Sequence, residues 1–501
     1  MKPDNLSDAI GSLNEEMIEE ANNARKKRRK MKWIPWVAGA ACIAVAVAIA
    51  RPMFTKETAD EKVPLGKSSQ TVFYDADQTL ASNYIARAQY PEMLKCPNMD
   101  DFMDDWDAYD KAYSDYLDEK WDYRESFKKP ENENYFDSFY QKSAQQFLSN
   151  SDGENVVFSP SNVYMALAML AELTDSESRQ QILELLGTES VESLRTEAKY
   201  LWGTNYSDDG LLTTRMANSL WLGEGLSYRQ ETMDLIAKEY YASSFSGVMG
   251  SDEYSEMLRT WINEQTNGLL ENQAQDLEFD ARTVMALAST IYFKGRWTDT
   301  FSDIATKPET FHAADGDVTV DFMHSSNTGV VYWGDSFTAT KKAMENSASM
   351  WLILPDEDKT VEDVLSEGEI FEMTASNGHW ENSKSMMVNL SMPKFDVSSE
   401  MDLIEGLQEL GVSDVFDYTV SDFTPMSEEL EQVYISQAEH AARVMVDEEG
   451  CEAAAYTVMM AECMGAILDE EEIDFVLDRP FIFVITGCGD TPLFIGVVNQ
   501  V

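Results

Sequence analysis

The stretch Val446-Asp-Glu-Glu-Gly-Cys-Glu-Ala-Ala-Ala-Tyr-Thr457 decides how the rest of this 501-residue chain is interpreted. Three acidic residues lead into Gly450, and small side chains without a proline follow. Such an alanine run is typical of a helix, because alanine is the best helix former. The alternative is a strand, in which successive side chains face opposite ways. One face of that strand would then be mostly small and the other would face outward: Cys451, Ala453, Ala455, Thr457 and Met459 against Glu452, Ala454 and Tyr456. A strand with a small face fits a narrow slot between two existing strands.

Three further segments accompany this stretch. They are Asn155-Val-Val-Phe-Ser-Pro160, Ala288-Ser-Thr-Ile-Tyr-Phe-Lys-Gly-Arg-Trp297 and Phe475-Val-Leu-Asp-Arg-Pro-Phe-Ile-Phe-Val-Ile485. In this order, and over residues 133–501, the four segments resemble the markers of inhibitory serpins, in particular those of bacteria. The resemblance implies an α+β serpin fold with a large central mixed β-sheet, surrounding helices and an exposed reactive-centre loop. Helical patterns that alternate with strand-like runs indicate an α+β domain independently.

The resemblance assigns a hinge and a reactive bond to the quoted stretch. The hinge comprises Glu448, Glu449, Gly450, Cys451, Glu452, Ala453, Ala454 and Ala455. Counting onward from Gly450 at the family's spacing places the bond that a protease cuts between Met464 and Gly465. Because the length of this loop varies in the family, Met460 and Leu468 remain alternative cleavage residues.

The loop composition predicts the class of target protease. No Lys or Arg lies between Gly450 and Leu477. This excludes trypsin-like targets, since their pocket carboxylate requires a cation. Methionine is flexible and apolar, so Met464 suits elastase-, chymotrypsin- or subtilisin-like serine proteases.

The resemblance, applied residue by residue, also implies two sites inside the serpin domain. The shutter, a polar cluster under the sheet, comprises Ser159, Asn162, Ser289 and His440. Asn162 stands where serine is common and Ser289 where asparagine is common, so we expect the amide and hydroxyl to meet His440 from opposite sides. Two unremarkable polar residues are the alternative. Trp297 corresponds to the breach, where the loop would first enter the sheet, and a large core aromatic is compatible with that role.

Composition excludes several classes of function. Lys and Arg total 38 against 90 Asp and Glu, a net charge of -52. Such acidity argues against nucleic acid and against heparin-like polyanions as partners. Nucleophile-elbow, zinc-protease, Cys-x-x-Cys and dinucleotide-binding signatures do not occur, and five cysteines form no disulfide framework. We therefore expect no enzyme, no cofactor and no metal site, and a monomer whose partner is a target serine protease.

The N-terminal region predicts a membrane anchor. A cytoplasmic acidic and basic segment covers residues 1–32, and residues 33–50 carry no charge, which is about the minimum length of a spanning helix. The basic residues before the span orient the N-terminus inward. We expect an uncleaved signal anchor with the serpin domain outside the cell. A signal peptide cleaved after Ala50 and a lipoprotein modified at Cys42 are the alternatives.

Two segments separate this anchor from the serpin domain at 133–501. Residues 51–79 lack an apolar pattern and are interpreted as a linker, and residues 80–132 form an acidic, aromatic extension. Five apolar side chains of the extension fall on one helical stripe: Phe102, Trp106, Tyr109, Tyr113 and Leu117. We expect this stripe to dock on the neighbouring domain. A surface for carbohydrate or for a protein partner is the alternative.

The sequence as a whole predicts a suicide substrate. In the family's mechanism, the cleaved loop inserts into the central sheet and traps the protease. The alternatives are a serpin-fold surface binding protein that does not inhibit, an inhibitor of papain-like cysteine proteases, and an adhesin that uses the aromatic stripe.

Overall fold

The computed structural model describes residues 80, 83–102, 105–149, 151, 153–275, 277–313, 315–376, 378–427, 433–451 and 471–501. The predicted anchor, the linker and the loop positions from Glu452 to Leu468 lie outside the described residues. None of the helices within the described residues combines the length and the apolar character that crossing a bilayer requires.

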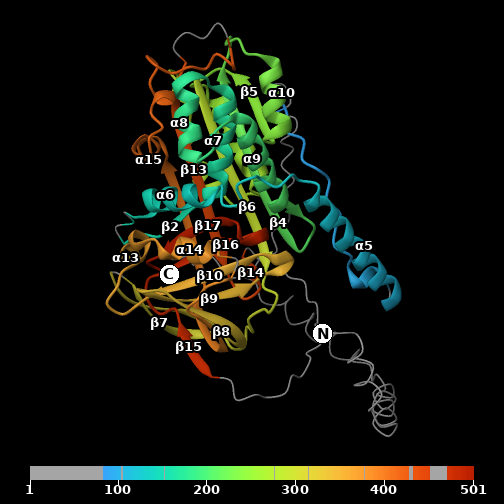
Figure 1. The fold of residues 1–501 in the computed structure, drawn as a ribbon, viewed down its shortest axis with the longest axis vertical. Coiled ribbons are helices and arrows are strands. Elements are labelled where there is room, and N and C mark those ends of the chain that lie inside the picture. Colours follow the sequence, from blue (N-terminus) through green and yellow to red (C-terminus); the bar gives the residue numbers. More distant parts are fainter. Residues whose placement is uncertain are drawn as a thin grey trace, which may run out of the picture. The chain divides into compact units, whose positions relative to one another are not determined.

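The first of two sheets is mixed and has eight strands (Figure 1). Its order is β1-β5-β4-β6-β14-β13-β12, with β3 beside β4. The pairs β4–β5 and β6–β13 are parallel, and the other pairs are antiparallel. The strands are β1 (Tyr84–Ala86), β3 (Ser207–Asp208), β4 (Leu212–Gly223), β5 (Ala242–Gly247), β6 (Met285–Arg296), β12 (Phe395–Asp402), β13 (Ile435–Val446) and β14 (Gly450–Cys451).

The second sheet has nine strands in the order β15-β11-β8-β9-β10-β16-β17-β2, with β7 beside β8. Its central strands β10, β16 and β17 are buried along their whole length, which explains their continuous apolar sequence. The strands are β2 (Val156–Phe158), β7 (Lys307–Ala313), β8 (Gly316–Trp333), β9 (Phe337–Ala343), β10 (Ser349–Pro355), β11 (Ser383–Pro393), β15 (Glu472–Val476), β16 (Phe481–Thr486) and β17 (Pro492–Val498).

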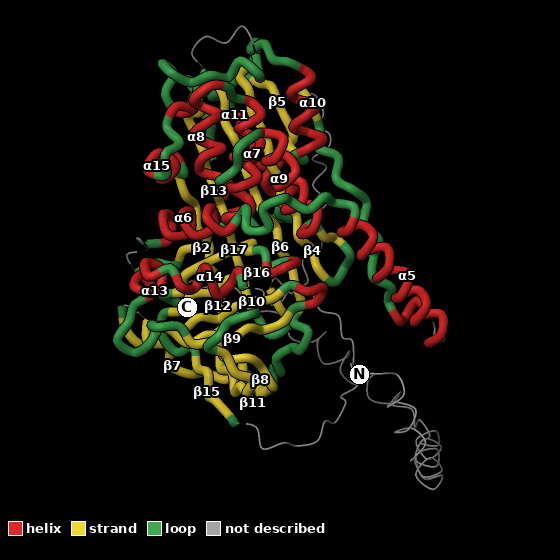
Figure 2. The backbone as a smooth tube through the Cα atoms, in the orientation of Figure 1, coloured by secondary structure: helices red, strands yellow, loops and turns green. Residues whose placement is uncertain are grey.

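Helices cover both faces of the first sheet. Figure 2 shows α7, α8 and α9 over one side of its strands. Alternate residues of β4 and β6 belong to two separate apolar clusters, one with α7 and one with α11. The helices are α6 (Asp137–Leu148), α7 (Pro160–Leu173), α8 (Ser176–Leu186), α9 (Val191–Asn205), α10 (Gln230–Glu239), α11 (Asp252–Gln265), α12 (Glu271–Ala274), α13 (Val361–Glu367), α14 (Glu369–Ala375) and α15 (Ile404–Glu409). The predicted α+β class with a large mixed sheet is confirmed.

The central helix α7 is apolar on all sides, and nearly all of its residues are buried. It begins where a good cap and a first-turn proline coincide. The Ser159 side chain accepts a hydrogen bond from the Asn162 backbone amide, and Pro160 occupies the first turn. This start fixes Ser159 and Asn162 directly beneath the first sheet.

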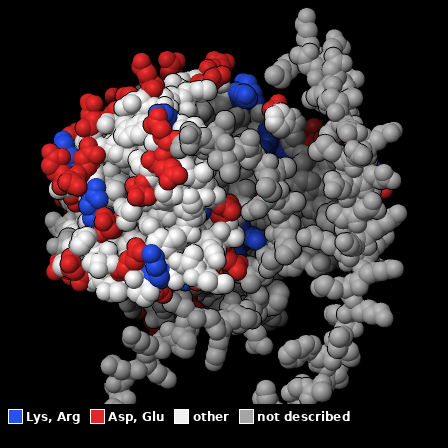
Figure 3. Space-filling model, turned by 90° about the horizontal axis from the view of Figure 1, so that it is seen from below, with Lys and Arg blue, Asp and Glu red and all other residues white. Residues whose placement is uncertain are grey.

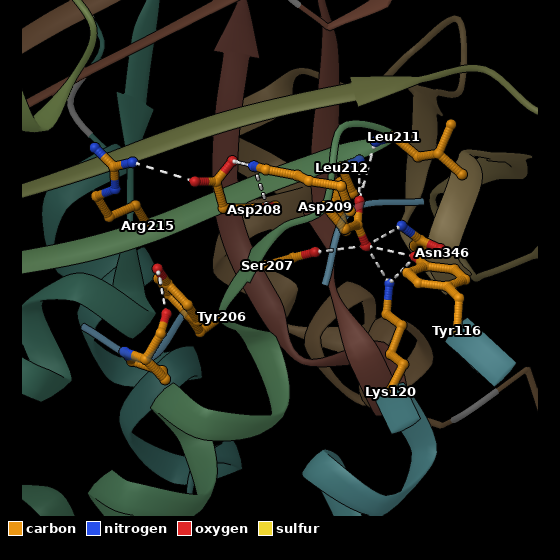
Figure 4. A network of polar contacts seen from close by, with 12 residues as sticks. Tyr116, Lys120, Tyr206, Ser207, Asp208, Asp209, Leu211, Leu212, Arg215 and Asn346 are labelled. Carbon is orange, nitrogen blue, oxygen red and sulfur yellow. Dashed lines mark hydrogen bonds and ion pairs between the residues drawn. The ribbon is translucent and has the colours of Figure 1, made fainter. Parts of the chain in front are cut away.

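The extension carries a further helix, α5 (Trp106–Glu125), and the predicted docking stripe is correct only in part: Tyr109 and Tyr113 are half-buried, whereas its other two helical members are exposed. Trp106 is 63% exposed and Leu117 is 45% exposed. The docked side is instead centred on Tyr116 and Lys120, which share the buried carboxylate of Asp209 (Figure 4). A distant polar partner thus rotates the helix away from the orientation that its apolar side chains alone would favour.

Two more contacts bind the extension to the serpin domain. Strand β1 pairs with the edge strand β5. The ring of Phe127 packs on Gly203 of α9, where an added Cβ would lie 2.2 Å from the ring. Glycine at this position therefore lets the ring reach the helix backbone, although glycine normally weakens a helix interior.

We predict that Gly203→Ala lowers the stability of the wild type but raises the stability of a variant in which Phe127 is replaced by alanine. In the wild-type background the new methyl group should displace the Phe127 ring and lower the free energy of unfolding by about 1–3 kcal/mol. In a Phe127→Ala background the same substitution should raise it by about 0.5–1 kcal/mol, because alanine favours the helix. Urea unfolding of the four proteins measures both effects, and a loss of stability in both backgrounds would contradict the packing described.

Candidate functional site

The two residues of β14 separate the C-terminal ends of β6 and β13. Gly450 pairs with Arg296, and Cys451 pairs with Gly295 on one side and Val446 on the other. Farther along, β6 and β13 pair directly with each other, up to Thr290 and Ala441. The space between β6 and β13, which we call the slot, is therefore open at the C-terminal ends of the two strands and closed farther along, where they pair directly.

Close approach of the backbone explains the small residues in this strand. A Cβ at Gly450 would lie 2.1 Å from the Gly295 carbonyl oxygen, so only glycine fits. The Cys451 side chain is 2% exposed and packs in the core shared with α7. The described start of the stretch is thus a strand, with Cys451 on the inward face that the period of two predicts.

The residues before β14 are held by Trp297. Its indole Nε1 donates to the Asp447 carbonyl oxygen at 3.0 Å, and its backbone amide donates to the Glu449 carbonyl oxygen at 2.9 Å. The ring is 1% exposed. Trp297 therefore ties the end of β6 to the segment that leads into the predicted hinge.

Glu448 is the middle one of three acidic residues in this segment. It accepts from Lys394 Nζ at 2.7 Å and from the Thr306 hydroxyl at 2.8 Å. Burial would raise the pKa of Glu448, but these hydrogen bonds outweigh burial and hold the pKa below its usual value. The ionised carboxylate therefore stabilises this arrangement at neutral pH.

Lys342 is a buried cation at the same place, which the sequence analysis did not single out. Its Nζ donates to the Asp299 carbonyl oxygen at 2.9 Å and lies 5.4 Å from the Trp297 ring and 4.2 Å from the Phe301 ring. Burial lowers the pKa of Lys342 to about 8. The aromatic faces stabilise this partly desolvated ammonium.

The four predicted shutter residues meet where α7 crosses β6 and β13. Ser289 and His440 are opposite each other in the parallel pair of strands. The Asn162 amide lies against Ser289 and Thr290, with its nitrogen 3.1 Å from the Thr290 carbonyl oxygen and its oxygen 3.1 Å from the Thr290 amide nitrogen. The Ser289 hydroxyl donates to Asn218 of β4 at 2.9 Å. Asn218 was missed, although a polar residue inside the apolar pattern of β4 is a usable signal.

His440 differs from the predicted arrangement. Its Nε2 accepts from the Ser159 backbone amide at 3.1 Å, whereas no bond to the side chains of Asn162 or Ser289 occurs. Its Nδ1 is buried and has no hydrogen-bond partner among the described residues. Burial lowers the pKa of His440 to about 4, so the ring is neutral and carries its proton on Nδ1. The expected approach of amide and hydroxyl from opposite sides is therefore wrong, because α7 presents its backbone to the ring.

Within the described residues, no cluster of three or more His, Cys, Asp or Glu side chains is arranged to hold a metal ion. The face drawn in Figure 3 shows many acidic and few basic side chains, in keeping with the net charge of -52.

Comparison with known proteins identifies the family. The model of the family Serpin (serine protease inhibitor) matches residues 135–501. Serpin-ZX of Arabidopsis thaliana is 28% identical over 366 residues, covering 70% of this chain and 92% of the relative. Alpha-1-antiproteinase 2 of Equus caballus is 30% identical over 373 residues, covering 72% and 84%.

A solved structure supports the same fold. The thermophilic serpin tengpin, in its native state, superimposes with a TM-score of 0.67 at 24% identity, over 75% of this chain and 96% of tengpin. At this identity the likeness concerns the fold alone. With the family match over residues 135–501, the chain belongs to the serpin family of serine protease inhibitors.

Proposed function

We propose that this serpin inhibits a serine protease as a suicide substrate. The observation that carries the proposal is the position of Gly450 and Cys451 between β6 and β13. The predicted hinge thus enters the sheet at Gly450, in a slot that continues toward the pair Thr290–Ala441. A protease would attack the Met464 carbonyl, form an acyl-enzyme and release the amine of Gly465. The freed segment would then insert as a new strand.

The register of β14 defines how such a strand would lie. Extended from the pairs Gly450–Arg296 and Cys451–Val446, it would place residues 452–461 along β6 from 294 to 285. At about 3.3 Å per residue this adds roughly 33 Å of new strand. Ala453 would then lie between Phe293 and Val444, both of which are buried in the core.

The same register gives the shutter a role. Thr457 would come to lie between Ser289 and His440, which now face each other. Its hydroxyl would offer an acceptor to the unpartnered Nδ1–H of His440. We infer that Ser159, Asn162, Ser289 and His440 favour insertion by leaving this buried donor unsatisfied in the native state.

The identity of the target is proposed from the loop sequence. Met464 favours elastase-, chymotrypsin- or subtilisin-like proteases, and the acidic residues 469–472 after the bond favour proteases with a basic rim. A papain-like cysteine protease is the second target class. We place the serpin domain outside the cell, on an anchor at residues 33–50, because this uncharged stretch follows a basic block. Protease added outside intact cells should then remove the serpin domain and leave residues 1–50 in the membrane. A secreted chain that begins near Arg51 would contradict the anchor.

The first prediction tests insertion with a pair of matched variants. Ala453→Glu would bury a carboxylate between Phe293 and Val444, which costs several kcal/mol. Ala454→Glu would put the same charge on the other face, beside Arg443 in the extended register. We expect Ala453→Glu to be cleaved without trapping protease and Ala454→Glu to trap it normally, as a denaturing gel would show. Undiminished trapping by Ala453→Glu would exclude insertion in this register. Cleavage of the wild type without any trapping would favour the binding protein that does not inhibit.

The second prediction concerns pH. The unfolded chain binds a proton at His440 below about pH 6.5, whereas the folded chain does so only near pH 4. The folded state should therefore lose about 3 kcal/mol of stability as pH falls between these values. His440→Asn should lack this loss, so the two proteins should converge toward pH 4 in urea unfolding. Parallel pH profiles would show that the ring is not held neutral.

The third prediction concerns specificity. Met464→Arg should shift inhibition toward trypsin-like proteases and leave the hinge intact, because the pocket carboxylate of those enzymes binds a cation. Sequencing of the fragment released from the wild type provides the direct measurement, and Gly465 should be its first residue. A fragment starting at Ala461 or Asp469 would move the reactive bond to Met460 or Leu468.

A further inference from the structure

A cleft of about 850 Å³ lies where the extension meets the serpin domain. Residues 86–89 and 126–128 of the extension form one side, and α9, α10 and Tyr241 form the other. Small-molecule sites have volumes of roughly 300–1,000 Å³. The cleft therefore has the size of a ligand site, and half of its wall is formed by residues outside the family match of 135–501.

The charge of the cleft is opposite to that of the chain. Four of its lining side chains are cations: Arg87, Lys128, Lys199 and Lys238. Asp234 is the one carboxylate in the lining, and it already accepts a hydrogen bond from Gln230. In a chain with 38 basic and 90 acidic residues, such a concentration of cations at one hollow makes a local site for an anion.

The three lysines among these cations are only partly neutralised. Lys199 and Lys238 share the single carboxylate of Glu239. Lys128 has no hydrogen-bond or ion-pair partner among the described residues. Like charges held close together repel, and an anion between them would relieve the repulsion.

The cleft also has an aromatic wall. The Tyr241 ring stacks on Trp202 with 3.5 Å between ring centroids, and the Phe127 ring is fixed against Gly203. Tyr241 has a φ of 51°, which is unfavourable for a bulky side chain. Strained residues of this kind occur preferentially at ligand sites.

We propose that this cleft binds a small organic anion with a flat aromatic body. The cations would bind the acidic group of the ligand, and the rings of Phe127 and Tyr241 would contact its flat aromatic part. A long polyanion fits less well, because the surface of the chain beyond the cleft is strongly acidic. Since both sides of the cleft contact the ligand, binding would also fasten the extension to α9 and α10.

Calorimetric titration of the full-length chain with three probes tests the proposal. The probes are 2-naphthalenesulfonate, the neutral 2-naphthol and inorganic sulfate. We expect one site for 2-naphthalenesulfonate with a Kd of about 100 µM or tighter, and at least roughly tenfold weaker binding of the other two. Hydrogen exchange should slow at residues 126–128 when the sulfonate binds.

Charge-reversal variants locate the site. Lys128→Glu and Lys238→Glu should each weaken 2-naphthalenesulfonate binding at least roughly tenfold, because each replaces an attraction by a repulsion. Lys307→Glu, an equal charge change at a 61% exposed lysine of β7, should alter binding less than about twofold. Absence of saturable binding, equal binding of 2-naphthol, an equal effect of Lys307→Glu, or binding of a sulfated polysaccharide alone would each overturn the proposal.

Discussion

The two-residue contact of Gly450 and Cys451 between β6 and β13 is the constraint on which the rest of the first sheet depends. It holds the C-terminal ends of these strands one strand apart. Parallel pairing holds their N-terminal halves together, up to Thr290 and Ala441. Extension of β14 would have to break that parallel ladder and replace it by two antiparallel ladders. Because each ladder bond contributes about 0.5–1.5 kcal/mol net, the longer strand favours the inserted state once the chain is free to move.

Several buried groups keep the slot in its half-open state. Trp297 binds the Asp447 and Glu449 carbonyl oxygens, and Glu448 is fixed by Lys394 and Thr306. These contacts are made by Asp447 and by the first two hinge residues, all before β14, so they anchor the segment without occupying the slot. At the closed end, the buried Nδ1 of His440 is left without a partner among the described residues. The polar groups at the open end of the slot are thus well hydrogen-bonded. The closed end carries an unsatisfied buried donor, which an incoming hydroxyl would satisfy.

Much of this arrangement could be predicted from the sequence, and the failures have a common cause. Period-two alternation predicts an inward Cys451, and this side chain is buried. The family resemblance predicts that Ser289 and His440 lie close together, and they are opposite each other in the paired strands. Local patterns did not reveal contacts between residues far apart in the chain. The α5 helix turns toward Asp209 because of a buried polar contact, against its apolar stripe. The shutter prediction failed at His440 because a backbone amide, which has no sequence signature, is its partner.

Asp209 connects the extension to the moving part of the molecule. Its carboxylate accepts from Tyr116 and Lys120 of α5 and from the Leu211 and Leu212 backbone amides that lead into β4 (Figure 4). It also accepts from Asn346, which lies in the turn that joins β9 and β10 of the second sheet. Burial would raise its pKa, but the Lys120 ammonium outweighs burial and keeps the carboxylate ionised.

Insertion between β6 and β13 has to move β4 and β6 relative to β12 and β13, since they lie on opposite sides of the slot. The extension is attached to β5 and to the start of β4, both on the same side of the slot. It would therefore move with that half of the sheet, and the bond from Asn346 to Asp209 crosses from the second sheet to the moving half. Because a buried carboxylate that loses a partner is costly, this bond opposes the same motion that the shutter favours.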